Sequence, residues 1–302
     1  MNGAGARDNR GGLLAATAAY GLWGLLPIFF RLLHHVGSFE LVAQRVVWSL
    51  ALVIGLLTAR HSLGPLRAAV GAPRILMALT ASALLIGINW TTYVWAVNAG
   101  HIVAASLGYF LNPLVSVGLG VMVLKERLRP RQIAAIAVAA IGVAIMAATA
   151  LTTLWISIVL AFSFAFYALV RKMTPVAPLV GLGAETLVLT PLAFFYLLWL
   201  HSHGGVAFGK DGITTLLIIA SGAVTTVPLV LFTTAAQRLP MATLGLLQYI
   251  APTLQFLCGV LLYGETLHQG QMVSFALIWT GLIVFAFDSY GSARRARMAM
   301  AA

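Results

Sequence analysis

Two ionisable residues, Arg45 and Glu185, lie within long apolar stretches of the 302-residue chain. If those stretches cross a membrane, each charge is costly to bury and indicates a binding site, a proton pathway or a structural charge bonded to a helix end. Arg45 is the candidate for direct contact with a ligand. Glu185 is the candidate proton carrier, because a carboxylate can take up and release a proton as it is exposed to either side.

Four prolines also lie within apolar stretches. A proline inside a helix frees the carbonyl group four residues before it, and in lipid that carbonyl needs another hydrogen-bond partner. The freed groups could bind a substrate, or the prolines could simply kink the helices for packing. The four residues predicted to break their helices are Pro27, Pro113, Pro228 and Pro252.

Polar and aromatic side chains accompany these prolines at helical spacing. Trp23, Tyr109 and Gln248 each lie four residues before one of them, and so share its helical face. Asn89 and Tyr93 share a face of another apolar stretch in the same way. We expect these five residues to bind a substrate together with the buried arginine. The alternative is that they make only interhelical hydrogen bonds.

Transmembrane helices must position these residues. Hydrophobic residues make up 61% of the sequence and charged residues only 8%, whereas a soluble domain carries roughly 25% charged residues. The single cysteine and the absence of a Cys/His cluster predict no metal and no cofactor. A span needs about 20 apolar residues. The stretches that fit are 12–30, 40–58, 75–96, 102–124, 132–150, 152–170, 179–200, 213–236, 241–263 and 270–288.

The distribution of lysine and arginine predicts the orientation of these ten helices. With the N-terminus inside, the inner segments hold fifteen of the 18 basic residues, while Arg31 and Lys210 are outside and Arg45 is within a span. This asymmetry follows the positive-inside rule and indicates that both termini are cytoplasmic. The net charge of +11 lies in these short clusters, a distribution that argues against nucleic-acid binding.

An internal repeat divides the apolar part of the chain. At an offset of 139 residues, Pro113 aligns with Pro252 and Gly142 with Gly281. Each repeat then holds five helices, an odd number, so the second copy must be inverted in the membrane. Inverted repeats are typical of secondary transporters, whose substrate site lies near the midplane between the repeats.

The sequence thus predicts an all-α integral membrane protein of ten transmembrane helices in two inverted five-helix repeats. Under this inversion Arg45 lies toward the outside and Glu185 toward the cytoplasm, too far apart for a direct ion pair in a core about 30 Å thick. Each charge is therefore expected to have its own partner or to contact water. Glu126, at a connection between helices, is expected to cap the helix that follows it. The predicted divisions are repeats 12–150 and 152–288, with cytoplasmic tails 1–11 and 289–302.

Two stretches in the first repeat resemble the RarD branch of the EamA-type transporters, in the drug/metabolite transporter superfamily. They are Asn89-Trp-Thr-Thr-Tyr-Val-Trp-Ala-Val-Asn98 and Ala105-Ser-Leu-Gly-Tyr-Phe-Leu-Asn-Pro113. In the second repeat, Gln248-Tyr-Ile-Ala-Pro-Thr253 fits the same pattern. The resemblance implies a ten-helix inverted-repeat permease of the bacterial cytoplasmic membrane. Asn112 and Tyr249, which lie within these stretches, complete the candidate substrate-binding set.

The resulting hypothesis is a secondary transporter of small metabolites or amphipathic drugs, with an unknown coupling ion. Its expected partners are a small-molecule substrate and membrane lipids, and the sequence leaves a homodimer open. No Walker, GxSxG or HExxH motif occurs in the sequence, which argues against an ATP-driven pump or a hydrolase. The alternatives are an intramembrane enzyme, or a membrane assembly or sensor protein with a transporter-like fold.

Overall fold

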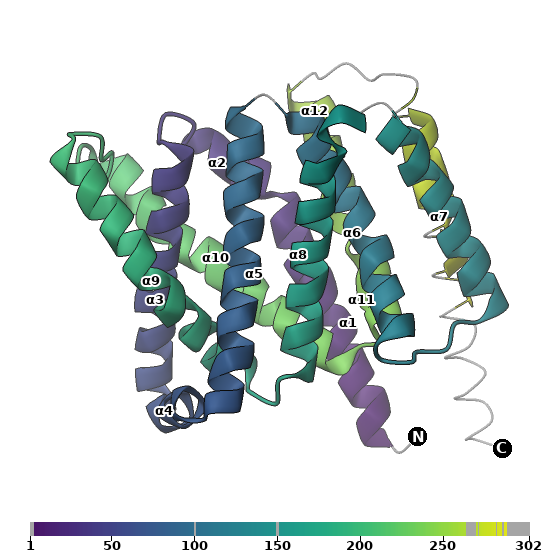
Figure 1. The fold of residues 1–302 in the computed structure, drawn as a ribbon, viewed down its shortest axis with the longest axis horizontal. Coiled ribbons are helices and arrows are strands. Elements are labelled where there is room, and N and C mark those ends of the chain that lie inside the picture. The colour runs from purple at the N-terminus through teal and green to yellow at the C-terminus, as the bar shows by residue number, and fades with distance from the viewer. Residues whose placement is uncertain are drawn as a thin grey trace.

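The protein is a bundle of helices in a computed structural model that describes residues 3–99, 101–148, 151–263, 270, 272–281, 283–285 and 287–288 (Figure 1). No strand occurs in these ranges, in agreement with the predicted all-α class. Residues 272–281 are helical. The other elements are α1 (Gly3–Gly24), α2 (Leu26–Leu32), α3 (Ser38–Ala59), α4 (Leu63–Gly71), α5 (Pro73–Asn98), α6 (Ile102–Met122), α7 (Pro130–Ala148), the 3₁₀ turn η1 (Leu151–Thr153), α8 (Leu154–Met173), α9 (Pro178–Ser202), α10 (Gly212–Arg238), α11 (Met241–Leu247) and α12 (Ile250–Tyr263).

Several helical stretches are long and apolar enough to cross a membrane, and they correspond to the first eight predicted spans. The ninth predicted span, 241–263, consists of two shorter helices, α11 and α12, and the tenth, 270–288, lies partly outside the described residues. The eight candidate spans found among the described residues are Asn9–Leu32, Ser38–Ala59, Pro73–Ala96, Ala105–Met122, Pro130–Ala148, Leu151–Met173, Pro178–Ser202 and Gly212–Arg238.

Large apolar side chains stand exposed on the outside of the bundle. On α9, Leu192 and Phe195 are each 75% exposed, and Ile213 at the start of α10 is 76% exposed. Soluble proteins rarely present extensive apolar surface to water. Lipid chains, in contrast, solvate such surfaces, so the outward faces of these helices are suited to contact with a bilayer.

Helices approach closely where small residues lie between them. α3 packs against α9 and α10, α1 against α10, and α5 and α6 against α8. A Cβ atom on Gly222 of α10 would lie 2.6 Å from the carbonyl carbon of Trp48 in α3, so glycine is needed there. The Ser49 hydroxyl also donates to the Gly222 carbonyl oxygen at 3.2 Å. In lipid, close packing and interhelical hydrogen bonds of this kind hold a bundle together.

Pro27 and Pro252 lie just after breaks in their helices, where α1 ends before α2 and α11 ends before α12. A proline at position 27 deprives the Trp23 carbonyl of its helical donor. That oxygen instead accepts a hydrogen bond from Nε2 of Gln255 in α12, at 3.0 Å. The two interrupted helices are therefore joined near their breaks.

The other two prolines do not interrupt their helices. α6 runs unbroken through Pro113 and α10 through Pro228, which corrects the expectation that these residues break their helices. Each proline removes one backbone hydrogen bond, a loss that a helix in a bundle tolerates where neighbouring groups satisfy the freed carbonyl. Neither residue lines the cavity that lies beside the two interrupted helices.

Polar contacts join chain segments at one end of the bundle, the lower end in Figure 1, where α4 and the turn between α10 and α11 lie. The Glu126 carboxylate accepts hydrogen bonds from the amides of Met241 and Ala242 at 2.7 and 3.0 Å. It therefore caps α11, and not the helix that follows it in the chain. Lys172 at the end of α8 donates to the Leu239 carbonyl oxygen. These bonds connect the α6–α7 connection, α8 and the α10–α11 turn.

Candidate functional site

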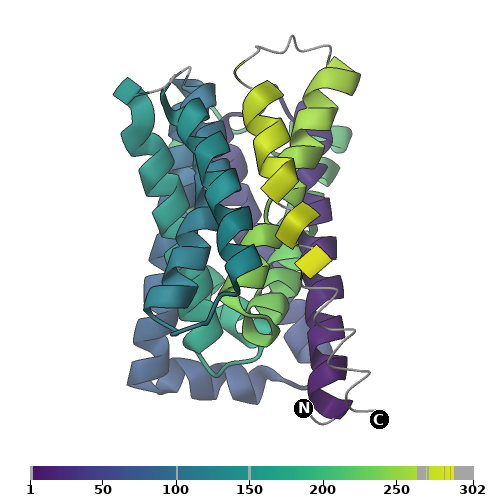
Figure 2. The ribbon, with the colours of Figure 1, turned by 90° about the vertical axis from the view of Figure 1, so that its right-hand side faces the viewer.

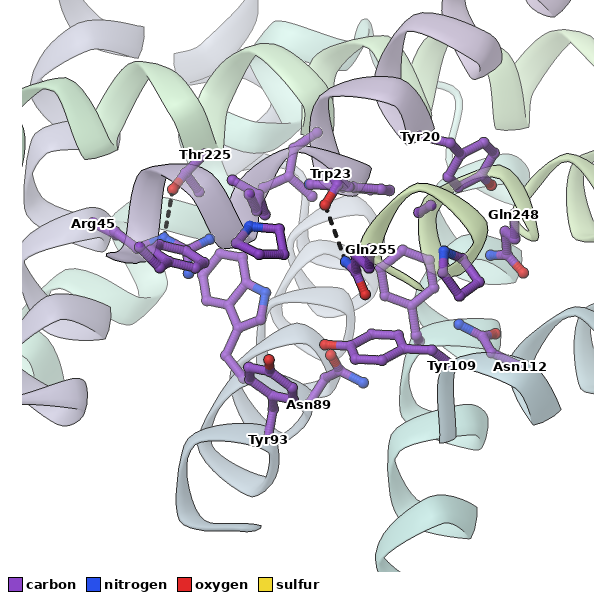
Figure 3. Close-up of a pocket in the computed structure, with 18 residues that line it drawn as sticks. Tyr20, Trp23, Arg45, Asn89, Tyr93, Tyr109, Asn112, Thr225, Gln248 and Gln255 are labelled. Atoms are coloured by element: carbon purple, nitrogen blue, oxygen red, sulfur yellow. Dashed lines mark hydrogen bonds between the residues drawn. The ribbon is translucent and has the colours of Figure 1, made fainter. Parts of the chain in front are cut away.

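A cavity of about 250 Å³ lies inside the bundle, where the two interrupted helices meet α3, α5, α6, α8 and α10 (Figure 3). This volume is close to the lower end for small-molecule sites and suits a compact ligand. Aromatic rings, amides, hydroxyl groups and a guanidinium make up its walls. The lining residues are Tyr20, Trp23, Leu26, Pro27, Phe30, Arg45, Asn89, Trp90, Tyr93, Tyr109, Asn112, Phe164, Thr225, Leu229, Gln248, Ala251, Pro252 and Gln255.

Arg45 lies at one end of the cavity and is held in a fixed orientation. Its Nε donates to the Thr225 hydroxyl oxygen at 2.7 Å. Its guanidinium carbon lies 5.0 Å from the ring centroid of Trp90 and 5.3 Å from that of Phe30. Both distances are within the range of cation–π attraction. Within the part of the chain that the structure describes, Arg45 has no carboxylate partner.

Gln248 lies toward the other end of the cavity, in the gap between α11 and α12 (Figure 3). It is only 5% exposed. The Ser116 hydroxyl donates to its Oε1 at 3.4 Å, which orients the amide. Among the described residues, Nε2 of Gln248 makes no hydrogen bond of good geometry, although the Tyr20 hydroxyl lies near it. A buried donor of this kind is costly unless an acceptor reaches it, so this end of the cavity is suited to a ligand oxygen.

Aromatic rings form the walls between these two ends. Tyr93 and Tyr109 meet edge to face with their centroids 5.6 Å apart. Trp23 meets Phe164 in the same way at 5.7 Å. Flat apolar surfaces of this type bind flat or amphipathic ligands. The described residues contain no group of three or more His, Cys, Asp or Glu side chains that could hold a metal ion.

The structure brings most of the predicted binding residues to this one cavity. Its lining includes Trp23, Pro27, Arg45, Asn89, Tyr93, Tyr109, Asn112, Gln248 and Pro252. The amide nitrogen of Asn89 already donates to the Leu160 carbonyl oxygen at 2.8 Å, so that group also serves packing against α8. Tyr249 lies outside the lining. It is fully buried, and its hydroxyl donates to the Phe110 carbonyl oxygen at 3.1 Å.

Glu185 also lies outside the cavity, in a buried ion pair. Its Oε1 is 3.3 Å from Nε of Arg171, and the two side chains are 2% and 0% exposed. The Ser82 hydroxyl donates to Oε1 at 2.5 Å, and the Tyr167 hydroxyl donates to Oε2 at 3.5 Å. Gly181 has no side chain to occupy the space that the Arg171 guanidinium fills. This environment gives Glu185 a structural role, and its role as a proton carrier stays a prediction.

Sequence reasoning missed some residues of the cavity and the partner of Glu185. Thr225 is 180 residues from Arg45, and no local spacing connects the two. Gln255, three residues after Pro252, could have been included from that spacing. Arg171 was expected in a cytoplasmic connection because the predicted span ended at residue 170. Since α8 continues to Met173, the guanidinium instead lies inside the bundle.

Comparisons with known proteins identify transporters as relatives of this chain. Residues 10–148 match the EamA-like transporter family. An uncharacterized transporter of Pseudomonas aeruginosa is 46% identical over 95% of this chain and 96% of its own length. Protein RarD of Streptomyces exfoliatus is 45% identical over 96% of this chain and 92% of its own length. Protein RarD of Escherichia coli is 42% identical over 96% of this chain and 98% of its own length. A crystal structure with a TM-score of 0.71 and 22% identity covers 90% of this chain and 96% of its own, and so shares the fold.

Proposed function

The chain belongs to the EamA-like transporter family as a RarD-type permease, and on this premise we propose that it is a secondary transporter acting by alternating access. It moves small metabolites or amphipathic drugs across the bacterial cytoplasmic membrane. The observation that carries this proposal is the cavity between two interrupted helices, α1–α2 from the first half of the chain and α11–α12 from the second. Interrupted helices near the interface of two repeats commonly form transporter substrate sites.

We propose that the architecture is ten transmembrane helices in two inverted repeats, 12–150 and 152–288. At the 139-residue offset, α9 matches α3, α10 matches α5, and α8 matches the end of α1 with α2. The packing of these helices is reciprocal: α1 contacts α10 while α8 contacts α5, and α3 contacts α10 while α9 contacts α5. Phe110 and Tyr249, which match at the same offset, stack with their centroids 6.4 Å apart. Both features support a two-fold relation between the repeats.

Contacts of α7 with the helix 272–281 support the inversion itself (Figure 2). A Cβ atom on Gly142 would lie 2.8 Å from the Ser274 carbonyl oxygen, and one on Gly281 would lie 2.5 Å from the Ala135 carbonyl oxygen. Gly142 matches Gly281 and Ala135 matches Ser274 at the repeat offset. These two contacts require that the matching helices run antiparallel. A two-fold axis in the membrane plane has that effect, and it is the basis of alternating access in inverted-repeat transporters.

The proposed orientation, with both termini cytoplasmic, gives a prediction for reporter fusions. Alkaline phosphatase fused after Gly37 or Gly209 should be exported and active, whereas fusions after Gly64 or Arg129 should be inactive. The reason is that Lys and Arg residues concentrate in the connections at the second pair of positions. Activity of all four fusions should be compared at equal protein abundance. An active fusion after Arg129 would contradict the orientation and the helix count together.

Transport is tested by uptake and exchange of a metabolite and drug panel with purified protein in proteoliposomes. We expect at least one solute to exchange across the membrane in a protein-dependent and saturable manner. Arg45→Gln should reduce that exchange because it removes the cavity's guanidinium, whereas Arg67→Gln, on the exposed face of α4, should not. If no solute exchanges, or if both variants behave alike, the proposed role of the cavity in transport is wrong.

A further inference from the structure

The five acidic side chains that the structure describes all have partners away from the cavity. The Glu40 carboxylate accepts a hydrogen bond from the Ala207 amide at 2.8 Å, and Asp211 accepts one from the Thr214 amide at 2.8 Å. The others are Glu126, which caps α11, and Glu185 and Asp288, which pair with arginines. The cavity lining therefore holds the positive charge of Arg45 and no acidic side chain.

Burying the Arg45 guanidinium inside the bundle costs free energy, because the group loses its hydration, unless another group compensates for that loss. Thr225 engages only Nε, and the rings of Trp90 and Phe30 offer cation–π attraction but no strong hydrogen-bond acceptor for the other guanidinium nitrogens. Arg45 remains on the cavity lining with these neighbours. A guanidinium fork fits a carboxylate through two parallel hydrogen bonds. An anionic ligand group would therefore supply the compensation that the protein does not.

The opposite end of the cavity, at Gln248, is suited to a neutral group of the ligand. Nε2 of Gln248 is a buried donor that makes no hydrogen bond of good geometry among the described residues, although the Tyr20 hydroxyl lies near it. Ser116 engages the oxygen of the same amide. Asn112 lies beside it, with its Oδ1 3.4 Å from the Ser116 hydroxyl. A ligand carbonyl or hydroxyl oxygen would accept a hydrogen bond from Gln248. Among the described residues, no acidic side chain lines that end to bind an ammonium group.

We propose that the substrate is a small organic monoanion with a carboxylate at Arg45, a flat apolar body between the aromatic walls and a neutral oxygen at Gln248. The cavity volume of about 250 Å³ limits this ligand to less than drug size. This assignment of substrate class rests on the proposed transport function, because it identifies the cavity as the site of transport. Solutes that carry an ammonium group in place of the carboxylate are excluded from the class.

The test uses three probes that share one body: 3-(4-hydroxyphenyl)propionate, its primary amide and 3-(4-hydroxyphenyl)propylamine. Binding of the tritiated carboxylate to purified protein in nanodiscs is measured, with the other two probes as competitors. We expect saturable binding of the carboxylate, with the amide and the amine at least tenfold weaker. Arg45→Gln should weaken carboxylate binding by about ten- to hundredfold, which corresponds to the loss of a charged hydrogen-bond partner.

Two further variants control for folding and for charge. Arg45→Lys keeps the charge but loses the fork, so it should bind the carboxylate better than Arg45→Gln does. Arg67→Gln should bind like the unchanged protein, and all variants must elute as one monodisperse species. Equal or tighter binding of the amide or the amine, or absence of carboxylate binding to monodisperse protein, would overturn the assignment.

Exchange in proteoliposomes separates this inference from the proposed function. If the carboxylate binds as expected but is not exchanged, the substrate-class chemistry of the cavity holds and the transport proposal fails. If amines or neutral solutes are exchanged without any preference for carboxylates, the transport proposal holds and the monoanion assignment fails.

Discussion

Replacing Glu185 with leucine should lower the free energy of unfolding by about 3–5 kcal/mol, because Arg171 would remain buried without its counter-charge. Both side chains are almost completely buried, so water cannot substitute for the lost carboxylate. The measurement is reversible unfolding in mixed detergent micelles of increasing denaturing-detergent fraction. Tryptophan fluorescence reports the transition.

The double variant Arg171→Met/Glu185→Leu is the matched control. It removes both charges and should recover most of the lost stability, since apolar pairs often replace buried ion pairs at little net cost. A double variant as unstable as Glu185→Leu would mean that the ion pair is not the cause. Glu185→Gln separately tests the proton role, because the amide keeps the shape and cannot titrate. Unchanged pH dependence of uptake in that variant would leave Glu185 with a structural role only.

Leucine at Gly142 or Gly281 should lower the free energy of unfolding by about 1–3 kcal/mol in each case. A Cβ atom at either position would lie within 2.8 Å of a backbone oxygen on the neighbouring helix, and backbone cannot move aside as a side chain can. The same substitution at Gly55 is the control, because nothing lies within 4 Å of a Cβ atom there. Unfolding is followed in the same detergent titration.

The repeat relation adds a requirement to this experiment. Since Gly142 and Gly281 make matching contacts, the two variants should be destabilised to a similar degree, and Gly55→Leu should be nearly neutral. Loss of stability at Gly55 equal to that at the other two sites would show a general effect of leucine. Stability unchanged at both Gly142 and Gly281 would contradict the close antiparallel packing of α7 on 272–281.

The membrane class and the first eight spans could be predicted from the sequence, because long apolar stretches with basic connections have few other structural explanations. The helix-breaking prediction for Pro252 anticipated an interruption of the ninth predicted span, but not two separate helices, since α11 and α12 together are as apolar as a continuous helix. The short helix α4 was also missed, because an amphipathic helix of nine residues carries little periodic signal.

The effect of each proline depended on contacts that the sequence does not display. Pro27 and Pro252 follow breaks in their helices. At the break before Pro27, Gln255 from another helix donates a hydrogen bond to the freed Trp23 carbonyl oxygen. Pro113 and Pro228 have the same local chemistry but lie in helices that continue on both sides. Local rules identify the lost hydrogen bond, and the packing of neighbouring helices decides whether the helix ends there.

Some residues of the candidate site could be predicted from helical spacing, and others depended on contacts between helices. Helical spacing brought Tyr109 and Gln248 into the predicted set because each shares a face with a proline a single turn away. Tyr249, the next residue, donates its hydroxyl to the Phe110 carbonyl oxygen instead. The pairing of Glu185 with Arg171 depended on where α8 ends, and helix ends are the least certain part of any reading of a sequence.

Thiol labelling of single cysteines tests most directly whether the cavity between the two interrupted helices is a solvent-accessible ligand site. Tyr109→Cys, Gln248→Cys and Tyr249→Cys would each be made on a Cys258→Ala background, because Cys258 is the chain's single cysteine. Tyr249 is the buried neighbour outside the lining, and Ser202→Cys on the exposed end of α9 is the positive control. With a water-soluble thiosulfonate reagent, we expect cysteines 109 and 248 to react, 3-(4-hydroxyphenyl)propionate to protect both, and cysteine 249 to stay unreactive. Unreactive cysteines at 109 and 248 in protein whose Ser202→Cys control reacts fully would contradict the account.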